Sequence, residues 1–134
     1  ESSSVIQCST NGIEPIRSYI TYKKSKARTL PVIVPNYSSY KNKYTLAYDM
    51  KDNTGLIKVV GALQKWVDMS ISANIYYNYA HYENGALPDA QVIKEQLLAY
   101  KLGWRTGYYL NTDDGDKQSS GDDGNGCESG ACAL

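Results

Sequence analysis

The sequence has no excess of charge of either sign. Its 14 lysine and arginine residues are matched by 14 aspartate and glutamate residues. A chain without net charge has no overall basic field to attract nucleic acid or an anionic membrane surface. Its apolar stretches fall well below the ~20 residues of a membrane span, and its start lacks the basic and apolar segments of a signal peptide. We therefore expect a cytoplasmic protein with no nucleic-acid or membrane partner.

Cysteine and histidine are also scarce. The sequence contains Cys8, Cys127, Cys132 and a single histidine, His81. An odd number of cysteines does not suit a secreted disulfide scaffold, so a reducing compartment is favoured. Structural zinc needs four ligands, and these four side chains would have to supply all of them. We expect no metal site in this chain.

The length of 134 residues is that of one domain. Serines 2–4 are good N-cap residues, and they predict a helix start at residues 1–4. β-Branched and aromatic residues at 17–23 and 30–34 predict a hairpin around residues 24–28.

The middle of the chain predicts a strand–helix–strand unit preceded by another helix. The first helix spans 56–71, with an apolar stripe at Leu56, Val59, Val60, Leu63, Trp66, Val67 and Ile71. Alternation at 71–79 predicts a strand whose Ser and Asn face could line a site. Pro88 and Gly103 bracket a second helix, in which Val92, Ile93, Gln96, Leu97 and Tyr100 share one face. Residues 104–110 predict the second strand, which gives an α/β fold.

The C-terminal segment has a different composition. Residues 112–126 read TDDGDKQSSGDDGNG, with no apolar side chain to offset the entropy of ordering. We expect a folded portion at 1–111 and a flexible tail at 112–134 that carries Cys127 and Cys132. A static disulfide within the tail would stabilise little else. A mobile dithiol that exchanges with a disulfide elsewhere is the favoured interpretation.

Five segments of the chain resemble the large subunit of class I ribonucleotide reductase. They are STNGIEP at 9–15, QKWVDMSISAN at 64–74, LLAYKLG at 97–103, TGYYLNT at 106–112 and CESGAC at 127–132. The resemblance implies the C-terminal part of a ten-stranded α/β barrel in which ribonucleoside diphosphates are reduced by radical chemistry. It assigns Tyr108 and Tyr109 to a radical relay and Cys127 and Cys132 to re-reduction of the active site.

The serine-rich start aligns with a family segment that holds the phosphates of the substrate. The resemblance therefore makes Glu1, Ser2 and Ser3 candidate substrate-binding residues, and a helix N-terminus suits an anion. The same serines could simply cap the helix.

The tyrosine pair raises a geometric problem, because neighbouring residues of a strand point to opposite faces whereas a relay needs contact between the rings.

The family's radical-forming cysteine, its reducing cysteines and its nucleotide-sensing regions have no counterpart here. We therefore expect a split, phage-type subunit that is inactive alone, in the host cytoplasm if phage-encoded. Its expected partners are an N-terminal piece of the large subunit, a small subunit with a metal-radical cofactor, and thioredoxin or glutaredoxin. Nucleotide effectors would bind the rest of the large subunit. The alternatives are a stand-alone thiol redox adaptor and a purely structural relic.

Overall fold

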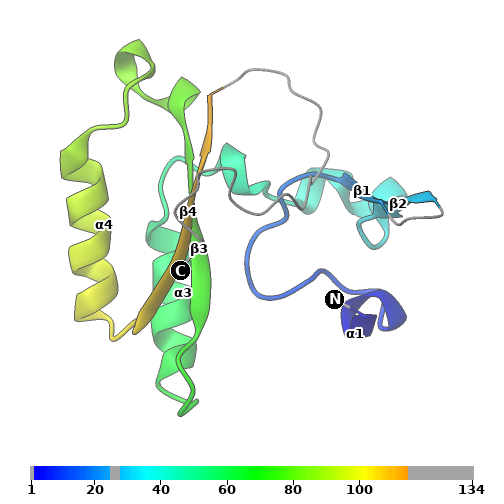
Figure 1. The fold of residues 1–134 in the computed structure, drawn as a ribbon, viewed down its shortest axis with the longest axis horizontal. Helices are drawn as coiled ribbons and strands as arrows, with labels where there is room; N and C mark the ends of the chain where they lie inside the picture. Colours follow the sequence, from blue (N-terminus) through cyan, green and yellow to red (C-terminus); the bar gives the residue numbers. More distant parts are fainter. Residues whose placement is uncertain (1, 25–27, 115–134) are drawn as a thin grey trace, which may run out of the picture.

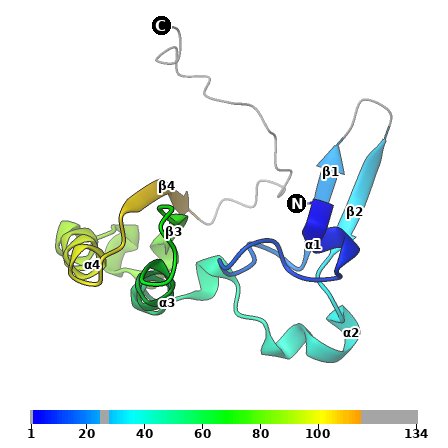
Figure 2. The same cartoon turned by 90° about the horizontal axis from the view of Figure 1, so that it is seen from below.

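The computed structural model describes residues 2–24 and 28–114. One group of elements contains helix α1 (Ser2–Ile6), strands β1 (Ile20–Lys24) and β2 (Thr29–Ile33) and helix α2 (Tyr37–Tyr40). The other contains helix α3 (Thr54–Gln64), strand β3 (Ser72–Asn78), helix α4 (Asp89–Lys101) and strand β4 (Thr106–Asp113) (Figures 1 and 2). Short 3₁₀ helices lie at Lys41–Lys43, Ala47–Asp49, Tyr79–His81 and Glu83–Gly85.

The strands form two separate two-stranded sheets, and the described residues do not close a barrel by themselves. Strands β1 and β2 pair antiparallel from Ile20–Ile33 to Lys24–Thr29, which confirms the predicted hairpin. Strands β3 and β4 are parallel and are joined through α4, which confirms the strand–helix–strand unit. In the described ranges, no helix combines the length and the apolar character needed to cross a membrane.

The boundaries of α4 follow the predicted signals, whereas β4 is longer than predicted. Pro88 precedes α4 with φ −68°, and Gly103 follows it with the left-handed φ of 80°. Strand β4 runs through Asp113, so the prediction that the tail begins at Thr112 was wrong for its first two residues. They are ordered because the parallel ladder continues, with Thr112 opposite Tyr77 and Asp113 opposite Asn78.

Helix α3 ends at Gln64, well before the predicted end at residue 71. The Gln64 side-chain amide donates to the carbonyls of Val67 and Met69, at 3.1 and 3.0 Å, and its oxygen accepts from the N–H of Ile71 at 2.8 Å. These bonds satisfy the backbone groups of a turn that replaces the last part of the predicted helix.

The core lies between α3, β3 and the segment that contains Ala47. Its buried members are Ala47, Leu56, Ile57, Val60, Ala73, Tyr76 and Trp104. The predicted stripe of α3 was correct for Leu56 and Val60. It was wrong for Val59, Leu63, Trp66 and Val67, which are exposed in the described chain. Apolar side chains therefore lie on both faces of α3, as in a helix buried within a larger assembly.

The face of α4 that carries Ile93 and Leu97 does not contribute to the core of the described chain. Ile93, Leu97 and Tyr100 are exposed, whereas Glu95 is only 1% exposed. Leu98, Ala99 and Leu102 instead pack against the core. The apolar face of α4 has no cover from the described residues. An exposed apolar face of this kind is typical of a surface that contacts another chain segment or protein.

Candidate functional site

The candidate site is built around an irregularity in β4. Ala73 lies opposite Gly107 and Ile75 lies opposite Leu110, so one residue of β3 faces two residues of β4. The two residues are Tyr108 and Tyr109. An extra residue in one strand is a β-bulge, which redirects side chains locally and often lies beside functional sites.

The bulge removes the geometric problem raised by the sequence. The rings of Tyr108 and Tyr109 have centroids 4.1 Å apart, with an angle of 54° between their planes. Consecutive residues of a regular strand would point their rings to opposite faces. The two side chains are 63% and 59% exposed, so the contact is made at an open surface of the described chain.

A side chain from β3 binds the bulge. The backbone N–H of Tyr109 donates to the side-chain oxygen of Asn74 at 3.1 Å. The Asn74 amide nitrogen donates to both carboxylate oxygens of Glu14, at 3.1 and 2.9 Å, and the Asn74 backbone N–H donates to one of them at 2.8 Å. Glu14 belongs to the loop before β1, so three distant parts of the sequence meet here.

Glu14 is held as a carboxylate by its surroundings. The hydroxyl of Tyr76 donates to it at 2.5 Å. Partial burial acts to raise the pKa of Glu14, but hydrogen bonds from Tyr76 and Asn74 and the charge of Arg17 outweigh it, so this pKa is below its ordinary value. Burial and the bond to Glu14 raise the pKa of Tyr76, so its hydroxyl stays protonated.

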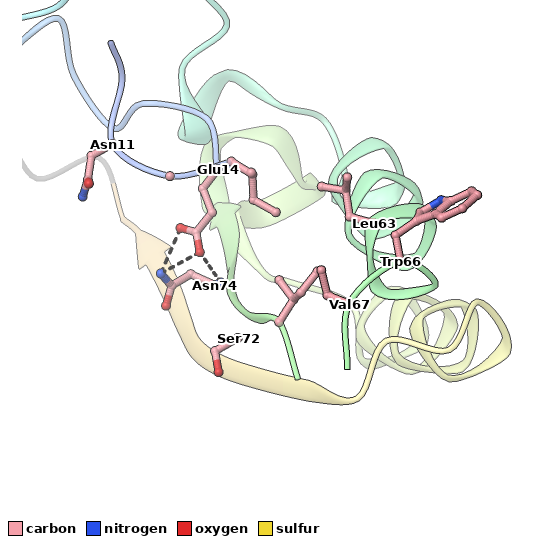
Figure 3. A pocket seen from close by; sticks show the side chains of 10 residues that line it. Asn11, Glu14, Leu63, Trp66, Val67, Ser72 and Asn74 are labelled. Atoms are coloured by element: carbon pink, nitrogen blue, oxygen red, sulfur yellow. Dashed lines mark hydrogen bonds between the residues drawn. The ribbon is translucent and has the colours of Figure 1, made fainter. Parts of the chain in front are cut away.

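A cavity of about 530 Å³ adjoins the Glu14–Asn74 pair. Figure 3 shows these two polar side chains on one side of it, and on the other Leu63 near the end of α3 with Trp66 and Val67 from the turn that follows. The apolar side of the cavity is formed by exposed side chains of α3 and of the turn that follows it. The tyrosine bulge and the cavity are therefore linked through Asn74.

The predicted phosphate-binding residues lie elsewhere in the described chain. Ser2 and Ser3 are the first two residues of α1, and Glu1 lies outside the described residues. In both overall views α1 is on the side of the β1–β2 hairpin, away from α4 (Figures 1 and 2). The structure does not bring α1 beside the tyrosine pair.

The remaining predicted site residues, Cys127 and Cys132, also lie outside the described residues. Residues 2–24 and 28–114 contain no group of three or more histidine, cysteine and acidic side chains that could hold a metal ion. Glu14 is a site residue that the sequence did not predict. The alternation in β3 marked the Asn74 face as a possible site, but no local pattern pairs it with a residue 60 positions away.

Comparison with known proteins gives one consistent family. A model of the ribonucleotide reductase barrel domain matches residues 34–110. The alpha subunit of ribonucleoside-diphosphate reductase 1 from Salmonella typhimurium is 43% identical over 139 residues, and that from Escherichia coli is 42% identical. Both alignments cover all of this chain and 18% of the relative. The alpha subunit from Enterobacteria phage T4 is 35% identical over 117 residues, which cover 86% of this chain and 16% of that protein.

Proposed function

Because this chain belongs to the ribonucleotide reductase barrel domain family, we propose that it forms part of the large subunit of a ribonucleoside-diphosphate reductase. The chain spans about a fifth of the length of these relatives. Its proposed activity is that of the assembled oxidoreductase, which replaces the 2′-hydroxyl of a ribonucleoside diphosphate by hydrogen. We expect this reaction to supply deoxyribonucleotides in the cytoplasm.

The observation that carries the proposal is the contact between the rings of Tyr108 and Tyr109. A radical can move across such a contact in balanced steps. The tyrosine that passes the radical inward takes up one electron and one proton, and its neighbour loses one of each and becomes a neutral phenoxyl radical. The initiating radical would come from the small subunit, which we expect to carry the metal-radical cofactor.

The tail would complete the redox cycle. Reduction of one substrate oxidises two cysteines of the barrel to a disulfide. The Cys127–Cys132 dithiol transfers two electrons and two protons to that disulfide by thiol–disulfide exchange and becomes a disulfide itself. Thioredoxin or glutaredoxin then reduces the tail. We propose that residues after β4 act as the tether for this exchange.

The N-terminal residues would contribute to substrate binding. Ser2 and Ser3 belong to α1, and the Ser3 side chain is exposed. Serine hydroxyls donate hydrogen bonds to phosphate oxygens. We propose that Glu1, Ser2 and Ser3 lie at the diphosphate of the substrate once the barrel is complete.

The exposed apolar faces of α3 and α4 support a need for partners. Val59 and Leu63 on α3, Trp66 just after α3, and Ile93 and Leu97 on α4 are exposed in the described chain. A parallel sheet is ordinarily covered on both faces and extends beyond two strands. We propose that an N-terminal piece of the large subunit supplies the remaining strands and the nucleotide effector sites.

The test is made in the reductase assembled from this chain, the rest of the large subunit and the small subunit. Tyr108→Phe and Tyr109→Phe should each abolish deoxyribonucleotide formation while substrate binding is kept, because phenylalanine packs similarly but has no phenolic proton. Tyr40→Phe is the control, since Tyr40 is also exposed but lies at the end of α2. If both test variants keep their activity, the radical-transfer role is refuted and the two tyrosines only pack against each other.

A further inference from the structure

The Tyr108–Tyr109 contact depends on a bulge whose backbone is bound by a side chain. Opposite the bulge, Asn74 accepts a hydrogen bond from the N–H of Tyr109. This bond lies at the irregular position of the ladder, between the pairs Ala73–Gly107 and Ile75–Leu110. The oxygen of Asn74 therefore fixes the backbone of β4 at the residue that carries one of the two rings.

Glu14 determines which way the Asn74 amide points. A carboxylate accepts hydrogen bonds and cannot donate them, whereas a side-chain amide has one donor end and one acceptor end. Both Glu14 oxygens accept from the Asn74 nitrogen. The donor end of Asn74 is thereby held toward Glu14 (Figure 3). Its acceptor end is left for the N–H of Tyr109.

The arrangement requires Glu14 to remain ionised. The Tyr76 hydroxyl donates to Glu14, and the Arg17 guanidinium lies 5.6 Å from the centre of the Tyr76 ring. The lowered pKa of Glu14 keeps it acceptor-only at neutral pH. Glu14, Tyr76 and Arg17 thus form a support on the side of Asn74 away from the bulge.

We propose that Glu14 and Asn74 are positioning residues for the tyrosine pair, acting through the chain of hydrogen bonds from Glu14 to Asn74 to the backbone of Tyr109. This inference rests on the proposed function of the pair in radical transfer. Neither residue exchanges an electron. They hold two rings in the geometry that the exchange needs, and displacements near 1 Å can lower a rate by about a hundredfold.

Two variants break the chain of bonds at different points. Asn74→Ala removes the acceptor of the Tyr109 N–H. Glu14→Gln keeps the size of the side chain but introduces a donor, so the Asn74 amide can turn and present its own donor end to Tyr109. The matched control is Asn78→Ala, because Asn78 also lies on β3 but donates to the carbonyl of Tyr48 instead of contacting the bulge.

The readouts are the kinetics of the assembled reductase and the fluorine magnetic resonance spectrum of the same enzyme with 3-fluorotyrosine at position 108. Asn74→Ala and Glu14→Gln should lower kcat by about a hundredfold with KM unchanged, and should shift or split the fluorine signal. Asn78→Ala should keep the original kcat and signal. The KM value and the control separate a displaced tyrosine pair from general unfolding of β3.

The proposal is overturned if both variants keep the original kcat and fluorine signal, or if kcat falls while the signal stays unchanged. An equal loss in Asn78→Ala would also overturn it, since any disturbance of β3 would then suffice. The spectrum separates this proposal from the proposed function. If Tyr108→Phe and Tyr109→Phe stay active, the relay fails, but a changed fluorine signal still assigns the positioning role.

Discussion

The hydroxyl of Tyr77 on β3 donates a hydrogen bond of 2.7 Å to the carboxylate of Glu95 on α4. Both side chains are buried, with 1% of each exposed. The same carboxylate accepts from the backbone N–H and the side-chain amide of Asn53, each at 3.0 Å, and from the amide of Gln91 at 2.6 Å. A buried polar network with every member bonded joins α4, β3 and the start of α3.

Removal of the carboxylate should destabilise the fold strongly. Glu95→Ala leaves the Tyr77 hydroxyl and the Asn53 N–H buried without their acceptor, and each such group costs about 1–3 kcal/mol. We expect the free energy of unfolding in urea to fall by about 3 kcal/mol. Glu95→Gln should cost less, because its amide oxygen still accepts. The exposed residue Glu83 provides the control, and Glu83→Ala should change stability by less than about 0.5 kcal/mol. Equal effects of the two alanine variants would contradict the role of the network.

The same contact should make stability depend on alkaline pH. Burial and the hydrogen bond to Glu95 raise the pKa of Tyr77 well above its ordinary value of 10.0. The folded state therefore holds the phenolic proton more tightly than the unfolded state, so this contribution is fully present below pH 10 and is lost as pH rises further. Tyr77→Phe should reduce the slope of the loss above pH 10 in urea unfolding, despite a lower starting stability. An unchanged slope would show that Tyr77 does not titrate differently in the two states.

Helix α4 shows what the sequence could and could not predict. The beginning and end of α4 could be predicted because Pro88 and Gly103 act through local backbone geometry. The burial of Glu95 could not be predicted, because it depends on a hydrogen bond from Asn53, which is 42 positions away. Ile93 and Leu97 are exposed in the described chain, and a periodic pattern does not tell which apolar face of a helix packs against its own chain.

The candidate site was predictable in a similar, partial way. The TGYYLNT segment identified the tyrosine pair, and the alternation in β3 marked the Asn74 face. The contact between the rings required a bulge, which depends on the register between two strands. The bond between Glu14 and Asn74 joins positions 60 apart, so it follows from the tertiary fold and from no local pattern.

Replacement by alanine should change stability in opposite directions at two glycines of α3, because only one of them lies close to the end of α4. A Cβ added at Gly61 would lie 2.8 Å from the Leu102 Cβ and 3.1 Å from the Leu102 carbonyl oxygen. Gly61→Ala should therefore destabilise the chain by about 1 kcal/mol, because overpacking of about 1–3 kcal/mol exceeds the gain in helix propensity. Gly55 has no atom within 4 Å of an added Cβ, and Gly55→Ala should stabilise by about 0.5 kcal/mol. The measurement is the midpoint of thermal unfolding of both variants. A higher midpoint for Gly61→Ala would contradict the close contact with Leu102.

The tail cysteines should be needed for repeated turnover. Cys127→Ser or Cys132→Ser in the assembled reductase should abolish repeated turnover with thioredoxin or glutaredoxin, because a single thiol cannot take the active-site disulfide through a full two-electron reduction. A single round of product formation from the pre-reduced enzyme should remain, since the barrel cysteines supply those electrons. Rapid-quench measurement of product per enzyme separates the two regimes.

The matched control for the tail is Cys8→Ser. Cys8 is an exposed free thiol that follows α1, so its loss tests whether any accessible cysteine can carry electrons to the barrel. We expect Cys8→Ser to keep full turnover. Undiminished turnover of the tail variants with the protein reductants would refute the shuttle, because the barrel disulfide would then be reduced directly. Disulfide reduction by this chain alone, with no other part of the reductase present, would instead favour an independent thiol adaptor.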